Sequence, residues 1–357
     1  QPFSEEEVRE VIRSLKNSGA TGPDGIPTTL LKRADGRLLQ LLTRLTNLSL
    51  TSGHYPTQGL EAKAYAHFKR KGSPNAPGNY RPIAITSVVS KVLEKLLARR
   101  LAKHLEDTNR LSPDQGGFRA GMGTTETLLF VAEEWHHLTN PRRTDRTPVV
   151  NAVFVDIAKC FDRIDRRLLL RKLQTEGGVP RRLCRLLESF LQPTAGRPQR
   201  VEFGGVLSDP ITVSTGVPQG ACLSPILAVL FLNTMGAGLR CKVSQFADDT
   251  CMYSDAPTEE AQLAELNADL ATLQGWCDKW RVDLKPSKCR HLIFDRRRKR
   301  LRQATAQLVH NRLSFPSPGG NVTFPTAECY TLLGVQFTPD LCFEKHVREG
   351  PLASLQN

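Results

Sequence analysis

The spacing of apolar positions along the chain predicts a mixture of helices and strands. The clearest helical periodicity covers residues 258–281, where apolar side chains recur every three or four positions. Similar patterns predict helices over residues 4–19, 29–52, 87–105, 180–191 and 226–235, the first opened by a capping box of Ser4 and Glu7. Short apolar runs between turn residues predict strands over residues 62–68, 79–83, 149–155, 199–203, 211–214, 242–245, 250–253 and 332–337. Helices interspersed with hairpins, rather than a regular βαβ series, indicate an α+β fold.

Two of these strands are joined by a tight turn that carries adjacent carboxylates, Asp248 and Asp249, in residues 246–249 (FADD). Adjacent carboxylates repel each other, and divalent cations between them offset this cost. Asp156 ends the strand at residues 149–155, and three carboxylates from two strand ends suit a two-metal phosphoryl-transfer site. An isolated Asp pair is more often ordinary turn chemistry, so the interpretation depends on other motifs along the chain.

A loop rich in glycine and proline, residues 216–225 (GVPQGACLSP), lies between the two acidic strands and leads into an apolar helix. Gly216 and Gly220 allow close approach of the backbone to a ligand, while Gln219 offers both a donor and an acceptor. If it stood alone, this segment would be interpreted as an ordinary loop with the N-cap of the following helix. Its position between the acidic strands favours a nucleotide contact.

The composition of the chain indicates the cellular compartment of the protein and the kind of partner that it binds. The 357 residues are enough for about two or three compact units, and the net charge of +13 favours an anionic polymer as partner. Nine scattered cysteines without a CxxC pair indicate neither a zinc cluster nor a disulfide framework, so a reducing compartment is expected. The longest apolar run, residues 226–232, is too short to cross a bilayer, and no signal-peptide pattern opens the chain. We expect a soluble intracellular protein, nuclear or cytoplasmic.

The order of motifs resembles the reverse transcriptase of non-LTR, LINE-type retrotransposons. The resemblance rests on residues 22–26 (GPDGI), 79–83 (NYRPI), 115–119 (QGGFR), 156–162 (DIAKCFD), 216–225 (GVPQGACLSP), 246–249 (FADD), 286–288 (PSK) and 332–335 (LLGV). It implies an α+β right-hand polymerase with fingers and an N-terminal extension over residues 1–145 and an antiparallel palm sheet packed on helices over residues 146–340, with finger elements interleaved. Residues 341–357 are expected to be the start of a largely absent thumb.

The resemblance also implies roles at the metal centre. Asp156 and Asp248 are the expected principal ligands of two Mg²⁺ ions, with Mn²⁺ as an alternative, and Asp249 adds charge beside them. The backbone carbonyl of Ile157 is expected to complete one ligand shell. Lys288 matches the lysine that the family places near the leaving pyrophosphate, which an ammonium group can protonate.

Further residues are expected to bind the incoming deoxynucleoside triphosphate. Phe161 matches an aromatic gate that crowds a ribose 2′-hydroxyl, although ordinary core packing would also explain a phenylalanine there. Gln219 and Gly220 are expected to touch the nucleotide, and Arg81, with Lys69 or Lys71, to grip its triphosphate. Each of these basic residues could instead be a solvated surface group.

Three features leave alternatives open. The basic run at residues 296–302 suits a nucleic-acid contact, a solvated hairpin or a nuclear localisation signal. Cys160, Ala221 and Cys222 depart from the usual family residues but are small enough to be tolerated. Because the thumb is expected to be incomplete, the chain is expected to be a segment of a longer polyprotein with an endonuclease, or a truncated copy.

The expected partners are an RNA template and a DNA primer or target site. Two rival functions remain: an inactive, RNA-binding remnant of a retroelement, and an RNA-templated RNA polymerase. Phe161 argues against the second, because an enzyme that makes RNA must accept the 2′-hydroxyl.

Overall fold

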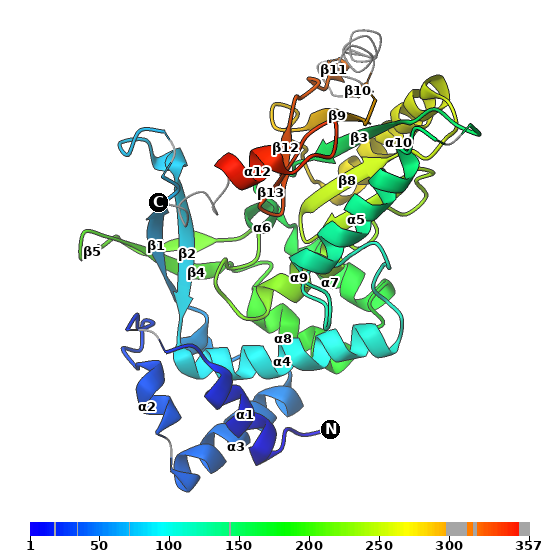
Figure 1. The fold of residues 1–357 in the computed structure, drawn as a ribbon. Coiled ribbons are helices and arrows are strands. Elements are labelled where there is room, and N and C mark those ends of the chain that lie inside the picture. The colour runs from blue at the N-terminus through cyan, green and yellow to red at the C-terminus, as the bar shows by residue number, and fades with distance from the viewer. Residues whose placement is uncertain are drawn as a thin grey trace. The chain divides into compact units, whose positions relative to one another are not determined.

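The computed structural model describes residues 1–17, 19–33, 35–70, 72–142, 144–297, 313–316 and 320–349 (Figure 1). The chain divides into two compact units, each built from two stretches. The first unit comprises Gln1–Leu111 and Lys159–Phe231, and the second Ser112–Ala158 and Leu232–Asn357. Helices and β-sheet occur in both units, which confirms the predicted α+β class.

The first unit combines a helical layer with a five-stranded sheet. Its helices are α1 (Glu5–Ser14), α2 (Thr28–Lys32), α3 (Gly36–Ser52), α4 (Val88–Asp107), α6 (Cys160–Arg163), α7 (Arg166–Thr175), α8 (Arg181–Leu191) and α9 (Ser224–Leu232), with short 3₁₀ turns at Thr57–Gly59 and Pro77–Asn79. Its strands are β1 (Ala62–Phe68), β2 (Tyr80–Thr86), β4 (Arg197–Phe203), β5 (Val206–Leu207) and β6 (Ile211–Val213). The strand order is β2-β1-β4-β5, with β6 also paired to β4, and only the β1–β4 pairing is parallel.

The N-terminal helices show how local capping sets the boundaries. The capping box of Ser4 and Glu7 opens α1 as predicted. The helical region predicted over residues 29–52 is divided into two helices, because α2 ends at Lys32 and the side chain of Asp35 accepts a hydrogen bond from the Leu38 N–H to start α3. An N-cap aspartate satisfies backbone donors that a continuous helix would bond internally, so it begins a new helix.

The second unit is built on a four-stranded antiparallel sheet with strand order β7-β8-β3-β9 (Figure 1). These strands are β7 (Lys242–Phe246), β8 (Asp249–Tyr253), β3 (Val149–Val155) and β9 (Arg290–Asp295). The described helices are α5 (Thr124–Leu138), α10 (Glu259–Trp280) and α12 (Glu344–Glu349). Two small hairpins pair β10 (Ser314–Phe315) with β11 (Val322–Thr323), and β12 (Tyr330–Leu332) with β13 (Val335–Phe337).

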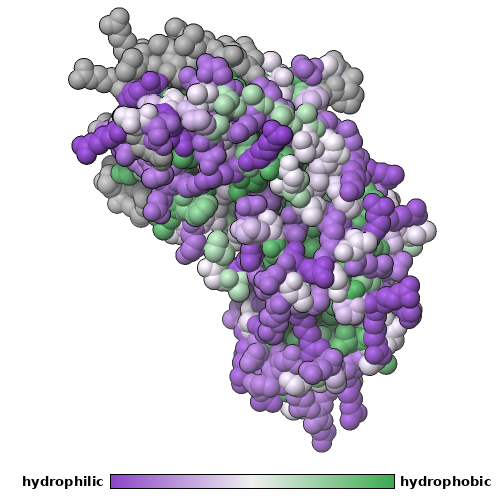
Figure 2. Space-filling view, turned by 90° about the vertical axis from the view of Figure 1, so that its right-hand side faces the viewer, coloured by the Kyte–Doolittle hydropathy of each residue, from purple (hydrophilic) through white to green (hydrophobic). Residues whose placement is uncertain are grey.

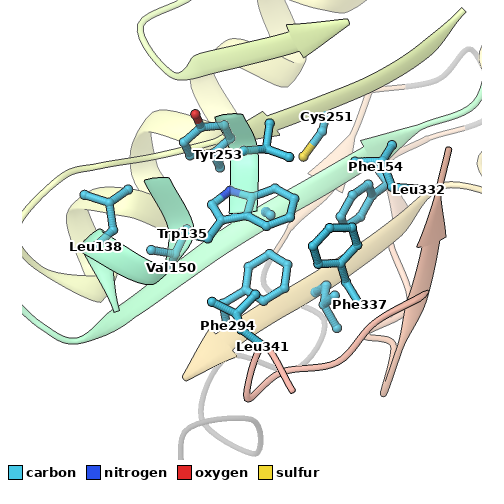
Figure 3. Packing of buried hydrophobic residues seen from close by; sticks show 13 residues of the cluster. Trp135, Leu138, Val150, Phe154, Cys251, Tyr253, Phe294, Leu332, Phe337 and Leu341 are labelled. Carbon is cyan, nitrogen blue, oxygen red and sulfur yellow. The ribbon is translucent and has the colours of Figure 1, made fainter. Parts of the chain in front are cut away.

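Both faces of β3 are covered, and every residue of the strand is buried. Alternate positions, including Val150 and Phe154, belong to the aromatic core around Trp135 of α5, whose ring stacks on Phe294 with centroids 4.3 Å apart (Figure 3). The backbone N–H of Asn151 instead donates to the side chain of Gln262 on α10. Helices on both sides explain why β3 is apolar at every position except Asn151, rather than alternating between apolar and polar residues.

The segment over residues 332–337 differs from prediction. A single strand was expected, but β12 and β13 form a hairpin with Leu332 opposite Val335. Leu333 and Gly334, between them, have φ angles of 47° and 87°. Two consecutive positive φ angles are typical of a tight hairpin turn, so Gly334 marks the reversal.

The surface is consistent with the charged composition. The face shown in Figure 2 is mainly hydrophilic, with hydrophobic residues in small groups between polar ones. Within the described part of the chain, none of the helices has the length and apolar character needed to cross a bilayer.

Candidate active site

Asp156 and Asp249 lie at the same end of the second unit's sheet. Strands β3 and β8 are antiparallel with Val155 opposite Thr250, so extending the register by one residue places Asp156 opposite Asp249. Directly opposed residues of such a pair have Cβ atoms about 4.5–5.5 Å apart. The sheet itself therefore brings these two carboxylates together from distant parts of the sequence.

Asp248 joins them from the turn between β7 and β8. Because Phe246 pairs with Asp249, only Ala247 and Asp248 form the turn. Ala247 has a φ of 58° and Asp248 does not have a positive φ, the pattern of a type II′ hairpin turn, in which glycine is usual at the first position. The left-handed conformation costs a residue with a Cβ about 1–2 kcal/mol, so other contacts must hold Ala247 in it.

The three carboxylates influence one another. Partial burial of its carboxylate, followed by the negative charges of Asp248 and Asp156, raises the pKa of Asp249 to about 6, and Lys288 opposes this rise. The residue as a whole remains exposed, so water screens part of the repulsion. Such a shift is expected where a carboxylate is partly buried beside like charges.

Lys288 provides a positive charge at this end of the sheet. Its Nζ lies 3.1 Å from Oδ2 of Asp156. The backbone fixes this approach, because the Lys285 N–H donates to the Asp156 carbonyl at 2.8 Å and the Lys288 N–H donates to the Lys285 carbonyl. Ile157 forms a β-bridge with Leu284 in the same segment. An ion pair this accessible to solvent adds little stability, so its significance is that it places a positive charge beside Asp156.

A second group of predicted residues meets in the first unit. The Gln219 side chain donates to Oδ1 of Asp162 at 2.9 Å, and the Val217 N–H donates to the carbonyl of Phe161 at 2.7 Å. Phe161 itself is half-buried. A Cβ on Gly220, whose φ is 121°, would lie 2.2 Å from the carbonyl oxygen of Ala84. The loop over residues 216–225 is therefore held against both α6 and β2.

The predicted triphosphate-binding residues lie on the β1–β2 hairpin of the same unit. Arg81 is exposed on β2, opposite His67 of β1. The Lys69 Nζ donates to the carbonyl of Gly78 at 3.0 Å, near the hairpin's tip. Lys71 lies outside the described residues. The first unit thus carries Arg81, Lys69, Phe161, Gln219 and Gly220, and the second carries Asp156, Ile157, Asp248, Asp249 and Lys288.

Sequence reasoning missed Glu94 of α4, which is completely buried. Its carboxylate accepts hydrogen bonds from the Tyr55 hydroxyl at 2.9 Å and from the backbone N–H of Cys222 at 2.7 Å. Burial raises the pKa of Glu94, while the positive charge of Arg197 lowers it. One sequence signal could have identified Glu94. It lies three positions before Leu97 and seven before Leu101, a spacing that places this acidic residue on the buried side of the helix.

Sequence reasoning also gave no role to Gln115 of the QGGFR motif. Its side chain is buried and hydrogen-bonds the backbone of Ala247, in the turn that carries Asp248. Nothing in the spacing of the motifs indicated this contact, because the two segments are far apart in sequence.

The donors around Asp156 fit a hard divalent cation in chemical type, since Mg²⁺ and Mn²⁺ prefer carboxylate and carbonyl oxygens. The raised pKa of Asp249, which results from burial and then from the negative charges of Asp248 and Asp156, is a second point of agreement. Among the described residues, no group of three or more His, Cys, Asp or Glu side chains is arranged as a ready metal site. Asp156 is also paired with Lys288.

The basic run at residues 296–302 is only partly described. Arg297 forms a bidentate pair with the buried Asp295, at 2.9 and 2.7 Å, so this arginine has a structural contact at the end of β9. Arg298 to Arg302 lie outside the described residues.

A family model described as reverse transcriptase (RNA-dependent DNA polymerase) matches residues 69–337. This span contains all the candidate residues of both units.

Curated relatives include proteins from mobile elements. The chain is 29% identical over 354 residues to "Probable RNA-directed DNA polymerase from transposon X-element" of Drosophila melanogaster, covering 98% of this chain and 36% of the relative. It is 26% identical to "RNA-directed DNA polymerase from mobile element jockey" of Drosophila funebris, covering 97% of this chain and 36% of the relative. A Pol polyprotein of element R2 from Popillia japonica is 28% identical, covering 71% of this chain and 35% of the relative. The chain thus spans about a third of the length of these relatives.

Among solved structures, apo telomerase from Candida Tropicalis, truncated from its C-terminal domain, has a TM-score of 0.48 and 14% identity, with 85% of this chain and 60% of that chain covered. This likeness is too low to assign the fold by itself.

Proposed function

Because the chain belongs to the reverse transcriptase family, a family of right-hand polymerases, we propose that it is the RNA-directed DNA polymerase part of a non-LTR retrotransposon protein. It would add deoxynucleotides to a primer 3′-hydroxyl on an RNA template. The observation that carries this proposal is the β3–β8 register, which sets Asp156 beside Asp249 with Asp248 in the adjoining turn. Three carboxylates at one sheet end are the arrangement that two-metal phosphoryl transfer requires.

In this proposal Asp156, Asp248 and Asp249, with the backbone carbonyl of Ile157, hold two Mg²⁺ ions, for which Mn²⁺ can substitute. Held by these residues, the ions would supply Lewis-acid chemistry at the attacking 3′-hydroxyl and at the leaving pyrophosphate. The Nζ of Lys288, which lies beside Asp156, donates a proton to that pyrophosphate.

The residues of the first unit bind and select the nucleotide. Arg81, with Lys69 and Lys71, grips the triphosphate through charge-assisted hydrogen bonds. Gln219 and Gly220 contact the nucleotide from a loop whose backbone is fixed on Ala84. Phe161 crowds the sugar at the position of a 2′-hydroxyl, and this favours deoxynucleotides.

The proposal also covers the subdomains of the chain, its partners and its cellular compartment. Residues 1–145 act as fingers, residues 146–340 as palm with finger elements interleaved, and residues 341–357 as the start of a thumb. The partners are an RNA template and a DNA primer or target site, within a longer polyprotein that includes an endonuclease. The expected compartment is the nucleus for a eukaryotic element, where the primer would be a nick in chromosomal DNA, and the cytoplasm otherwise.

Primer extension on an RNA template with Mg²⁺ tests the activity. We expect the wild-type chain to extend the primer, and D156N or D248N to lose at least about 10³-fold in rate, because each removes a charged metal ligand. The control D107N changes an exposed aspartate on α4 and should retain activity. Wild-type chain that binds RNA but extends no primer, even when lengthened past Asn357, would instead support the RNA-binding remnant.

Nucleotide choice separates a DNA polymerase from an RNA polymerase. The wild-type chain should prefer deoxynucleotides, and F161A should gain ribonucleotide incorporation by about 10-fold or more, because a smaller side chain makes room for the 2′-hydroxyl. Efficient ribonucleotide addition by the wild-type chain would contradict the proposal.

A further inference from the structure

The side chain of Gln115 hydrogen-bonds both polar backbone groups of one residue in the acidic turn. Its Oε1 accepts from the N–H of Ala247 at 2.8 Å, and its Nε2 donates to the carbonyl of Ala247 at 3.3 Å. The same Oε1 also accepts from the Gly117 N–H at 2.8 Å. Gln115 is completely buried, so water does not compete for these bonds.

The backbone around Gln115 explains how the side chain reaches the turn. Residues 114–116 run beside β7, where the Gln245 N–H donates to the Asp114 carbonyl and the Gly116 N–H donates to the Gln245 carbonyl, both at 2.8 Å. These bonds form a parallel bridge between Gln115 and Gln245. The segment therefore covers the edge of β7 and fixes the position from which the Gln115 side chain extends.

The two glycines of the QGGFR motif permit this approach. A Cβ on Gly117 would lie 2.3 Å from the backbone nitrogen of Ala247, and a Cβ on Gly116 would lie 2.5 Å from Oγ1 of Thr127. Neither distance is tolerable for a real side chain. Gly117 thus lets the segment lie directly against the turn, and Gly116 lets it pass close to Thr127 of α5.

Ala247 needs an external restraint, because its φ of 58° is unfavourable for a residue with a Cβ. The next residue along the chain is Asp248, so relaxation of Ala247 would reorient this carboxylate and its neighbour Asp249. We propose that Gln115 is a positioning residue, which holds Ala247 in the left-handed conformation and thereby sets the direction of both carboxylates. This inference rests on the proposed polymerase function for its catalytic consequence, but not for its structural one.

The first measurement is hydrogen exchange at the Ala247 amide in the metal-free chain. In the wild type this amide should exchange slowly although it lies in a hairpin turn, because Gln115 holds it. Q115M keeps the side-chain volume and removes every hydrogen bond to Ala247, so exchange there should accelerate by about 10-fold or more. Fast exchange in the wild type, or unchanged exchange in Q115M, would overturn the proposal, and the wild-type result requires no variant to fold.

Gln262 provides a matched control. It is a completely buried glutamine of the same unit, and its side chain bonds Asn151, Val149 and Ala256, away from the turn. Q262M should lower the melting temperature as Q115M does, yet leave exchange at Ala247 unchanged. Equal acceleration in both variants would mean that general loosening, rather than a specific restraint, controls the turn, and would overturn the proposal.

Primer extension then tests the catalytic consequence at a temperature where both variants are folded. Q115M should lower kcat by about 10- to 100-fold, because small displacements of catalytic groups are costly, and should raise the Mg²⁺ concentration for half-maximal activity. KM for the deoxynucleotide should change less than about 2-fold, since that site lies on other residues. Wild-type kcat and Mg²⁺ dependence in Q115M would overturn the proposal. Inactive wild-type chain would instead defeat the proposed function, and hydrogen exchange at Ala247 would still decide the role of Gln115.

Discussion

The carboxylate of Glu94 links Tyr55 to Cys222, accepting from the tyrosine hydroxyl through one oxygen and from the Cys222 backbone through the other. A carboxylate buried this fully is costly unless it is paired, and the buried Arg197 supplies the opposite charge. The guanidinium of Arg197 in turn donates to the carbonyls of Phe190 and Gly59. This polar network therefore connects α4, α8 and the loop over residues 216–225 within the first unit.

Replacing Glu94 by Ala should destabilise the chain by about 3 kcal/mol, because it leaves the Tyr55 hydroxyl, the Cys222 N–H and the charge of Arg197 buried without their shared partner. Urea unfolding measures this free energy. As a control, E6A removes an exposed glutamate of α1 and should change stability by less than about 0.5 kcal/mol. A loss below about 1 kcal/mol for E94A would show that the network contributes little.

Replacing Gly220 by Ala should impair the loop over residues 216–225. The new Cβ would lie 2.2 Å from the Ala84 carbonyl oxygen, and the φ of 121° is itself unfavourable for alanine. We expect KM for the deoxynucleotide to rise by about 10-fold or more, together with a loss of stability of about 2 kcal/mol.

Gly205 provides the control for this substitution, because its φ is 80° and a Cβ there would meet no atom within 4 Å. G205A therefore tests the backbone conformation without the clash, and it should cost about 1 kcal/mol and leave KM unchanged. Equal effects of G205A and G220A on KM would contradict the role of close backbone packing.

Burial of the Asp249 carboxylate, together with charge repulsion at the sheet end, should make the metal-free chain respond to the removal of this carboxylate. Because the pKa of Asp249 is raised from 3.8 to about 6, the folded chain binds more protons than the unfolded chain between these pH values. Stability of the metal-free wild type should therefore fall as pH rises from about 4 to about 6, and D249N should remove this part of the pH dependence.

At pH 7 without divalent ions, D249N should be more stable than the wild type, by at most about 1 kcal/mol since the site is exposed to solvent. Adding Mg²⁺ should stabilise the wild type more than D249N. Thermal unfolding with EDTA and with Mg²⁺ measures both effects. A less stable D249N in EDTA at pH 7 would show that burial and repulsion of this carboxylate do not destabilise the folded chain.

The strands that position the carboxylates were predictable because the sequence patterns that indicate them lie within a few consecutive residues. The strands that end near Asp156 and begin near Asp249 read as apolar runs of the right length, and the predicted strand bounds differ by a residue at most. The break before α3 and the turn at Gly334 were missed, although Asp35 and Gly334 are the residues that cause them. In both cases an apolar pattern that continues across a short turn concealed the break.

The supporting contacts were not predictable in the same way. Gln115 meets Ala247, and Glu94 meets Cys222, across more than a hundred residues of sequence. A single sequence does not show which residues of two such distant segments lie opposite each other. It also does not distinguish a buried polar residue from an exposed one, because burial depends on neighbours that only the fold brings together. Motif order identified which residues matter for chemistry, while the hydrogen bonds that fix them emerged only from the fold.

Lys288 offers a test that separates proton donation from simple charge. Its ammonium lies 3.1 Å from Asp156, so K288M removes both a positive charge and a proton donor, and we expect the single-turnover rate of nucleotide addition to fall by about 10²-fold. K288R keeps the charge beside Asp156, but a guanidinium does not release its proton under these conditions. If Lys288 protonates the pyrophosphate, K288R should be nearly as slow as K288M. The control K285M removes a nearby exposed lysine and should retain the wild-type rate. Full activity of K288R would assign Lys288 an electrostatic role and exclude its action as a general acid.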